Sequence, residues 1–436
     1  MLQTPVRKLR GHAHYGWAIF SLAFANLTVE GGMKNSAPVL FLALRDSFGR
    51  GAAATAAIFS VGGLTGAIVA PLLGNLLDRL GPRYLFPVGG AVIFLAYISS
   101  SLVSDFWQLF FFYGVLATVG ETIVSSFTAT AVLAPWFPKS RGRVLGLADA
   151  GNPLGQGIFA PLSQLLILAF GWRVALRVLG PIFFLLVAPA NLLFQRRPPS
   201  RSTPIEEQEN GADGIPGDAV QAEDTTGGSP GVSEHATGRE QFRAILRGAP
   251  LWCLVLARTS AAVGHQMTIL HLVAFFVASG YSHLEAASTI GVVGLISLGG
   301  RPLTGALSDY VGRELIYTVG LGMQVAGILV VLLLGDGESF WPIVLFVGLT
   351  GLSDGIAGIA VGAKAADLFP SSTLGSVMGV VQSGRGVGVM AGPILGGLLY
   401  DRQGDYVLAF SLAVVMMGVA VLFMWSAGIT GGKGRY

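Results

Sequence analysis

Long apolar segments, separated by short polar connections, recur along the whole chain. Each is about 20 residues or longer, the length that an α-helix needs to cross a hydrocarbon layer of about 30 Å. The first segment follows a basic run at 5–14 and is too long for the apolar core of a signal peptide, so no cleavable leader is expected. The pattern predicts an all-α membrane protein with twelve spans, at about 15–44, 52–77, 84–103, 106–135, 143–170, 172–194, 250–279, 284–308, 314–334, 340–366, 374–399 and 405–428.

Composition supports this pattern. Charged residues make up 12% of the chain, whereas a soluble domain carries roughly 25%, so much of the surface must face apolar surroundings. The 62 glycines allow helices to approach closely in lipid. A single cysteine, Cys253, excludes an intrachain disulfide. Basic residues stand at the ends of apolar runs rather than in a stripe with aromatic residues, so nucleic acid is not an expected partner.

The distribution of basic residues predicts the orientation. Eighteen of the 27 Lys and Arg residues fall on the side of the termini and five on the other. Cytoplasmic loops carry such an excess of Lys and Arg, so we expect both termini on the cytoplasmic side of a cell membrane. The connection at 195–249 is then cytoplasmic, and its acidic part at 202–238 indicates a flexible linker, with a regulatory tail as the alternative. We expect a first bundle at 15–194 and a second at 250–430.

The two halves repeat one another. PLLGNLLDRLG at 71–81 corresponds to PLTGALSDYVG at 302–312, an offset of 231 residues, and WFPKSRGRVLG at 136–146 corresponds to LFPSSTLGSVMG at 368–379. Two six-helix bundles in parallel repeat are typical of transporters that rock around a site between the halves, near the middle of the membrane.

The string GNLLDRLGPR at 74–83 resembles the signature loop of the major facilitator superfamily, and a second copy follows span eight, with Tyr310 where the family carries a basic residue. The resemblance implies this superfamily's fold. It also implies that the two aspartates latch a gate, with solvated loop charges as the alternative. The residues of this gating motif are Gly74, Asp78, Arg79, Gly81, Arg83, Asp309 and Arg313.

A narrower resemblance is to the monocarboxylate transporters and the bacterial oxalate/formate antiporter group. It rests on YGW at 15–17, WFPKSRGRVLG, GWR at 171–173, and Arg301 followed by Pro302. It implies that small carboxylates are carried and that Arg301 anchors them. The proton-coupled members have an acidic residue one helical turn before this arginine, where Ser297 stands here.

Ionisable residues inside the predicted spans are costly in hydrocarbon and should face a cavity or a partner. Arg301 lies about 12 Å inside its span at 1.5 Å per residue, and its planar guanidinium can hold a carboxylate at two points. A structural ion pair is the alternative. The eight residues concerned are Glu30, Lys34, Glu121, Asp149, Arg258, Arg301, Asp354 and Arg385.

Lys34 and His265 are equivalent in the repeat, and both are candidates for substrate binding. The resemblance adds that Lys34 matches, with a shift of one residue, a lysine in the first span of the monocarboxylate transporters. Glu30 stands four residues earlier and could instead neutralise Lys34 within the helix. His265 and His271 are proton-carrier candidates because a free imidazole titrates near neutral pH, with satisfied core histidines as the alternative.

Glu121 and Asp354 are also equivalent in the repeat. Together with Glu30 and His271 they are candidates for proton coupling, because a carboxylate in an apolar cavity can hold a proton near neutral pH. Neutralisation of Arg258 or Arg385 is the competing interpretation. Glycine-rich surroundings favour packing roles for Asp149 and Arg385. Weaker candidates for polar lining of the substrate site are Tyr113, Ser126 and Ser297.

The sequence therefore predicts a secondary transporter of small mono- or dicarboxylates in the lipid bilayer, working by alternating access with proton co-transport. No catalytic motif, metal-ligand spacing or cofactor motif occurs in it, so enzyme activity, metal and cofactor are not expected. Two alternatives stay open. One is a drug or neutral-metabolite exporter, suggested by GPILGG at 392–397, and the other is a membrane sensor that signals through the linker.

Overall fold

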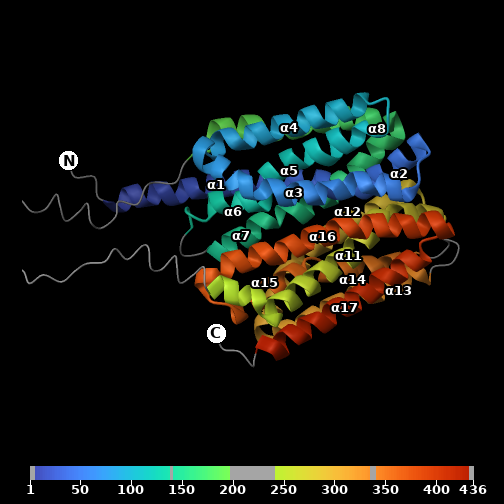
Figure 1. The fold of residues 1–436 in the computed structure, drawn as a ribbon. Helices are drawn as coiled ribbons and strands as arrows, with labels where there is room; N and C mark the ends of the chain where they lie inside the picture. The colour runs from blue at the N-terminus through green and yellow to red at the C-terminus, as the bar shows by residue number, and fades with distance from the viewer. Residues whose placement is uncertain (1–4, 138–140, 197–240, 334–339, 432–436) are drawn as a thin grey trace, which may run out of the picture.

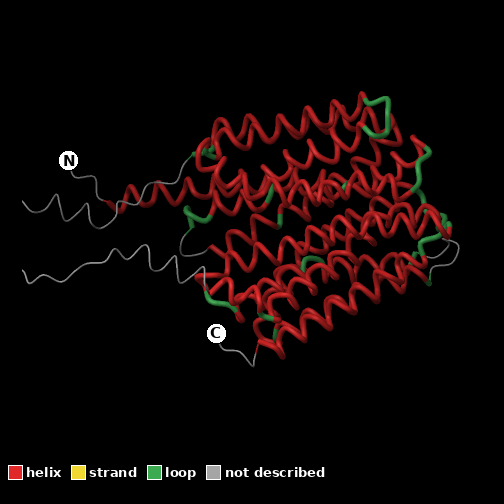
Figure 2. The backbone as a smooth tube through the Cα atoms, viewed as in Figure 1, coloured by secondary structure: helices red, strands yellow, loops and turns green. Residues whose placement is uncertain are grey.

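The computed structural model describes residues 5–137, 141–196, 241–333 and 340–431. Over these ranges the chain is almost entirely helical and has no β-strand (Figure 2). This confirms the predicted fold class. The acidic segment 202–238 lies outside the described residues, so the linker prediction stays a prediction.

Each predicted span corresponds to a helix or to consecutive helices. Among the described residues, nine helical stretches are long and apolar enough to cross a membrane, and one of these, Gly142–Phe194, holds two spans that meet at Gly171 with a positive φ of 79°. The first half contains α1 (Pro5–Asn35), α2 (Ala37–Phe48), α3 (Ala52–Leu80), α4 (Pro82–Leu102), the π-helical η1 (Phe110–Ala117), α5 (Thr118–Val124), α6 (Ser126–Leu133), α7 (Arg141–Asp149) and α8 (Gly151–Phe194). The second half contains α11 (Ala249–Ala278), α12 (His283–Val311), α13 (Arg313–Leu332), α14 (Trp341–Ser353), α15 (Ile356–Leu368), α16 (Ser371–Gln403) and α17 (Val407–Gly431).

The two halves form two adjoining groups of helices, blue to green and yellow to red in Figure 1. The beginning of α1 and the end of α8 meet where the Tyr15 hydroxyl donates to the carbonyl of Phe194. The beginning of α1 and the end of α17 lie at this end of the molecule, which we call the terminal side (Figure 1). One apolar core lies within the first half and contains Phe86 and Phe183, and a second one, containing Phe276 and Phe410, also includes Phe41 of the first half.

Four predicted spans are interrupted. The first breaks at Ser36, between α1 and α2. The fourth breaks at Ser125, whose extended backbone (φ −64°, ψ 168°) separates α5 from α6. The fifth breaks at Ala150, between α7 and α8. The tenth breaks at Asp354 and Gly355, between α14 and α15. The apolar pattern predicted one uninterrupted segment in each case, because hydropathy indicates which residues lie in the membrane and does not indicate where a helix breaks.

Helices α3 and α16, and helices α8 and α12, pair across the contact between the halves. A Cβ on Gly294 would lie 2.7 Å from the carbonyl oxygen of Pro153, and one on Gly397 would lie 2.5 Å from Cα of Ala53. Only glycine permits backbones to approach so closely. The contact is therefore tight from the middle of the molecule to the side away from the termini.

Aromatic residues complete the contact on that side. The guanidinium of Arg45 on α2 lies 5.4 Å from the ring centroid of Tyr400 and donates to the Tyr406 hydroxyl at 3.4 Å. Tyr400 and Tyr406 stack with their centroids 4.3 Å apart. Phe41 of the first half meets His271 of the second edge to face, at 4.8 Å. These contacts join α2 to the second half.

Candidate functional site

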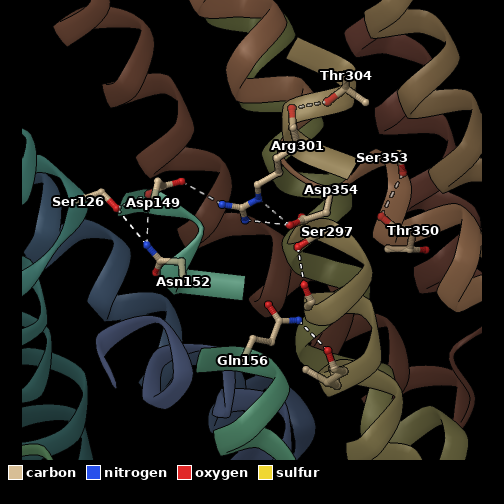
Figure 3. Close-up of polar contacts among 12 residues, drawn as sticks. Ser126, Asp149, Asn152, Gln156, Ser297, Arg301, Thr304, Thr350, Ser353 and Asp354 are labelled. Atoms are coloured by element: carbon tan, nitrogen blue, oxygen red, sulfur yellow. Dashed lines mark hydrogen bonds and ion pairs between the residues drawn. The ribbon is translucent and has the colours of Figure 1, made fainter. Parts of the chain in front are cut away.

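Arg301 projects from α12 into the contact between the halves, where two carboxylates hold its guanidinium (Figure 3). Its Nη2 donates to Oδ2 of Asp354 at 2.8 Å, and its Nε lies 3.3 Å from the same oxygen. Its Nη1 donates to Oδ2 of Asp149 at 3.1 Å. Asp354 belongs to the same half as Arg301 and Asp149 to the other. The ion pair with Asp149 therefore links the two halves.

The break between α14 and α15 positions Asp354. Asp354 has an extended backbone (φ −62°, ψ 136°) and Gly355 a left-handed one (φ 82°), as an Asp-Gly turn favours. A Cβ at position 355 would lie 3.1 Å from Nε of Arg301. Glycine at this position thus permits both the turn and the close approach of the guanidinium.

The break between α5 and α6 supports Asp149 in a similar way. Ser126, the first residue of α6, donates its hydroxyl to Oδ1 of Asp149 at 2.6 Å. Nδ2 of Asn152 lies 3.2 Å from the same oxygen and 3.1 Å from the Ser126 hydroxyl. An interrupted helix from each half thus contributes to the surroundings of Arg301. We call these residues the Arg301 cluster: Ser126, Asp149, Asn152, Arg301 and Asp354.

The Arg301 cluster is accessible, whereas the contact on its far side is closed. The exposed fraction of the side chain is 27% for Arg301, 41% for Asp149 and 15% for Asp354. About two helical turns further from the terminal side, the buried Gln156 donates to the carbonyl of Ile290 at 2.8 Å. A molecule that entered between the halves from the terminal side would meet Asp149 and Arg301 before this closed level.

Ser297, predicted as lining, is not positioned to contact a substrate. It is fully buried, and its hydroxyl donates to the carbonyl of Gly294 at 2.9 Å within its own helix. Ser126 does reach the neighbourhood of Arg301, through Asp149. Of these two predicted lining residues, Ser126 thus belongs to the cluster, and Ser297, on the arginine's own helix, does not.

Lys34 lies in the last turn of α1 with its side chain 52% exposed, and its Nζ lies 3.5 Å from Oε1 of Glu30, whose side chain is 3% exposed. The couple within the helix, which the sequence offered as one alternative, is therefore present. Glu30 is also within electrostatic reach of Asp149 and Arg385. The accessible amine of Lys34 resembles the Arg301 guanidinium in that an acid of the protein, Glu30, already pairs with it.

The two candidate histidines differ. His271 is fully buried, its Nε2 lies 2.9 Å from the carbonyl oxygen of Pro393, and aromatic rings of both halves pack on it. These contacts are those of a core histidine. His265 is half-buried, interacts with Gln324, and lines a small cavity with Thr268 and Thr350 inside the second half.

Glu121, Arg258 and Arg385 form no ion pair or hydrogen bond with the described residues. The hypothesis that Asp354 neutralises Arg258 or Arg385 is wrong, because Asp354 is bound to Arg301. Arg258 lies against Gly358 of α15, where a Cβ would be 3.2 Å from its Nη2. Among the described residues, no group of three His, Cys, Asp or Glu side chains could hold a metal ion.

Comparison with known proteins shows the family of the chain. The family model of the Major Facilitator Superfamily matches residues 22–361 and 305–430. The chain belongs to the Major Facilitator Superfamily. Its relatives include human Monocarboxylate transporter 11, 28% identical over 408 residues, which cover 92% of this chain and 80% of the relative. Bovine Monocarboxylate transporter 13 is 27% identical over 400 residues, which cover 92% of this chain and 86% of the relative.

A solved structure has the same fold. It is that of a bacterial homolog of the human lysosomal transporter Spinster, in an inward-facing and unoccupied conformation, with a TM-score of 0.70, 17% identity and coverage of 98% of both chains. The protein is thus a multi-pass membrane transporter of this superfamily, and the predictions of fold class and family resemblance are confirmed. Its relatives are transporters and not enzymes.

The gating motif of this superfamily member lies at the terminal side. Gly81 (φ 74°) and Gly312 (φ 99°) make equivalent turns, from α3 to α4 and from α12 to α13. Nε of Arg83 donates to the carbonyl of Leu192 at 2.9 Å, and Nε of Arg313 lies 3.3 Å from Oδ2 of Asp367. Arg79 is exposed. The surroundings of Gly74, Asp78 and Asp309 lie outside the described part of the structure, so the latch stays a prediction.

Tyr113 lies in the interior of the first half. It is 8% exposed, stacks on Tyr97 with ring centroids 5.8 Å apart, and lines a cavity with Met33, Ser36 and Ser163. This cavity and the one beside His265 occupy equivalent places in the two halves, since the lining residues Ser36 and Thr268 are 232 residues apart and Tyr113 and Phe346 are 233 apart. None of the contacts of Tyr113 links it to the Arg301 cluster.

Sequence analysis missed two features of the site. Asn152 was not singled out, although DAGN at 149–152 places an amide next to an intramembrane acid. Asp149 was assigned a packing role from its glycine-rich surroundings, whereas its carboxylate in fact contacts Arg301. The sequence did contain a signal for both residues, because the acid Asp149 and the amide Asn152 stand within one helical turn of each other inside a predicted span.

Proposed function

We propose that the protein is a secondary transporter of small organic anions, mono- or dicarboxylates, working by alternating access, and that Arg301 binds the substrate carboxylate. One observation supports this above the others: an accessible guanidinium at the contact between the halves already binds two carboxylates. Groups that bind Asp side chains in this way have the geometry to bind the same chemical group on a free molecule. The names of its relatives point to the same substrate class.

We propose further that transport is coupled to protons and that Glu121 is the first group to examine. It is half-buried within the predicted fourth span and has neither an ion pair nor a hydrogen bond with the described residues. A carboxylate in such surroundings exchanges its charge for a proton more readily than one held by a cation. We also propose a cell-membrane location with cytoplasmic termini, from the distribution of Lys and Arg.

The substrate proposal is tested by uptake of labelled lactate, pyruvate or oxalate into proteoliposomes. We expect uptake by the wild type, no uptake by Arg301→Ala and only a small remaining uptake by Arg301→Lys. An ammonium cannot replace the two-point contact of a guanidinium. Arg402→Ala, which changes an exposed arginine away from the site, is the control. Full uptake by Arg301→Ala would contradict the anchoring role, and inhibition by hydrophobic cations instead of organic acids would favour an exporter.

Coupling is tested with the same vesicles by imposing a pH gradient. We expect acidification outside to stimulate uptake in the wild type and to leave uptake in Glu121→Gln unchanged, because a neutral amide cannot gain or lose the proton. Stimulation of equal size in both proteins would remove Glu121 from the coupling mechanism. Absence of any stimulation in the wild type would remove proton coupling itself.

A further inference from the structure

Both edges of the Arg301 guanidinium are occupied. Nε and Nη2 face Asp354, and Nη1 faces Asp149. A guanidinium offers five N–H donors along such edges, and a carboxylate binds best when it accepts from two of them. A substrate carboxylate can therefore gain a two-point contact only where one of the two acids leaves.

The contacts indicate which acid leaves. Asp354 accepts two bonds from Arg301, interacts with the backbone N–H of Gly355 and is 15% exposed. Asp149 accepts one bond from Arg301 and is 41% exposed. Ser126 and Asn152 also bind its other oxygen, so its carboxylate keeps donors after it separates from Arg301. Displacing Asp149 is the less costly exchange.

Asp149 is also the acid that comes from the other half. Its contact with Arg301 runs between α7 and α12, next to the tightly packed pair of α8 and α12. An anion that took its place would break an ion pair between the halves at the same moment as it bound. Binding of the anion and loss of the ion pair between the halves would then occur together, at Nη1 of Arg301.

We propose that Asp149 is a built-in competitor for the substrate: its carboxylate occupies Arg301 in the empty protein, and the substrate carboxylate displaces it and so frees the two halves to move. This inference rests on the proposed anion binding at Arg301. It assigns Asp149 the role of setting the affinity and of linking occupancy to the contact between the halves. Asp354 remains bound and keeps Arg301 in position.

The direct test is the dissociation constant of lactate, measured by calorimetry on purified wild type, Asp149→Asn and Arg301→Ala. A charge-assisted bond between partly exposed groups is removed in Asp149→Asn, so we expect lactate to bind about tenfold more tightly. Asp149→Glu retains the charge and should stay within about threefold of the wild type. The control is Asp367→Asn, which removes the acid facing Arg313, an ion pair of similar length outside the site.

A second measurement follows the halves. Spin labels are placed on α7 and α12 by Arg143→Cys and Tyr310→Cys, two exposed positions, after Cys253→Ser removes the single native cysteine. Lactate should change the distance distribution in the wild type. Asp149→Asn should show the changed distribution without lactate. A residue with a merely structural role would not reproduce the effect of the ligand.

The outcomes separate the two proposals. Unchanged or weaker lactate binding in a folded Asp149→Asn protein, together with loss of binding in Arg301→Ala, overturns the competitor role and leaves the anchoring role intact. Undiminished binding in Arg301→Ala overturns both. If Asp149→Asn does not fold, tighter lactate binding by Asp149→Ser supports the proposal, and unchanged binding overturns it.

Discussion

The carboxylate of Asp401, near the end of α16, accepts the first two backbone N–H groups of α3, from Ala52 at 2.7 Å and Ala53 at 2.9 Å. The acid belongs to the second half and the helix to the first. Free N–H groups and the helix dipole make the beginning of a helix a favourable place for an anion. A helix cap thus joins the halves on the side away from the termini.

Replacing Asp401 should therefore open this side. Asp401→Asn loses the charge and one acceptor oxygen, at a cost of about 1 kcal/mol, which favours the opened form roughly fivefold. Spin labels at Ser47→Cys on α2 and Gln403→Cys on α16, in the Cys253→Ser protein, should report a larger population of long distances. Asp405→Asn is the control, because Asp405 accepts from Val407 within one half. An unchanged population in Asp401→Asn would contradict the role of the cap.

The pair of Arg301 and Asp354 should contribute to stability as well as to binding. Asp354→Asn weakens two contacts to the partly exposed Arg301 guanidinium from an acid that is itself 15% exposed, so we expect the free energy of unfolding to fall by about 2 kcal/mol. The melting temperature in detergent measures this. Asp367→Asn weakens an exposed pair with Arg313 and should cost at most about 0.5 kcal/mol. Equal losses in the two variants would mean that the Arg301 pair is no stronger than a surface pair.

Contact between α1 and α8 should depend on Gly155. A Cβ at this position would collide with the carbonyl oxygen of Thr28, and α8 cannot shift without losing its other contacts. Gly155→Ala is expected to lower stability by about 1–3 kcal/mol. Gly146→Ala, on α7, meets open space and should be neutral or up to about 1 kcal/mol more stable, because alanine favours the helix. Melting of the two variants side by side checks the difference.

Glu30 should destabilise the protein when Lys34 is replaced. Lys34→Met leaves the buried carboxylate without its nearest cation, and we expect a loss of roughly 2 kcal/mol. Adding Glu30→Gln removes the uncompensated charge. The free energy of unfolding of the double variant, followed by thermal melting, should therefore lie within about 1 kcal/mol of the wild-type value. A double variant as unstable as Lys34→Met would show that Lys34 stabilises the protein by some route other than this pair.

Much of the fold was predictable, because crossing a membrane needs about 20 apolar residues and the chain contains that signal twelve times. The place of Arg301 within a long apolar helix was predictable for the same reason. Its partners were not. Hydropathy tells which segment lies in the membrane, but it does not tell which faces of α7 and α12 meet, and these helices are about 150 residues apart.

The internal repeat did not predict one difference between the contacts of the two halves. It placed Glu121 and Asp354 at matching positions and so predicted matching roles. In the structure Asp354 holds Arg301, whereas Glu121 has no ion pair with the described residues. The difference follows from Arg301 itself, since its equivalent in the first half is Ala70 and provides no charge. One sign of the break was available: the Asp-Gly dipeptide at 354–355 is a common turn.

Gly355 limits how the site can be redesigned. Any other residue there would be strained at φ 82° and would meet the guanidinium. The wall behind Arg301 is thus made of bare backbone, and the volume of the arginine side chain is what fills that corner. Shortening Arg301 would empty a corner that position 355 cannot refill. A transporter engineered for uncharged cargo would have to gain its new contacts from the opposite wall, at Ser126 and Asn152.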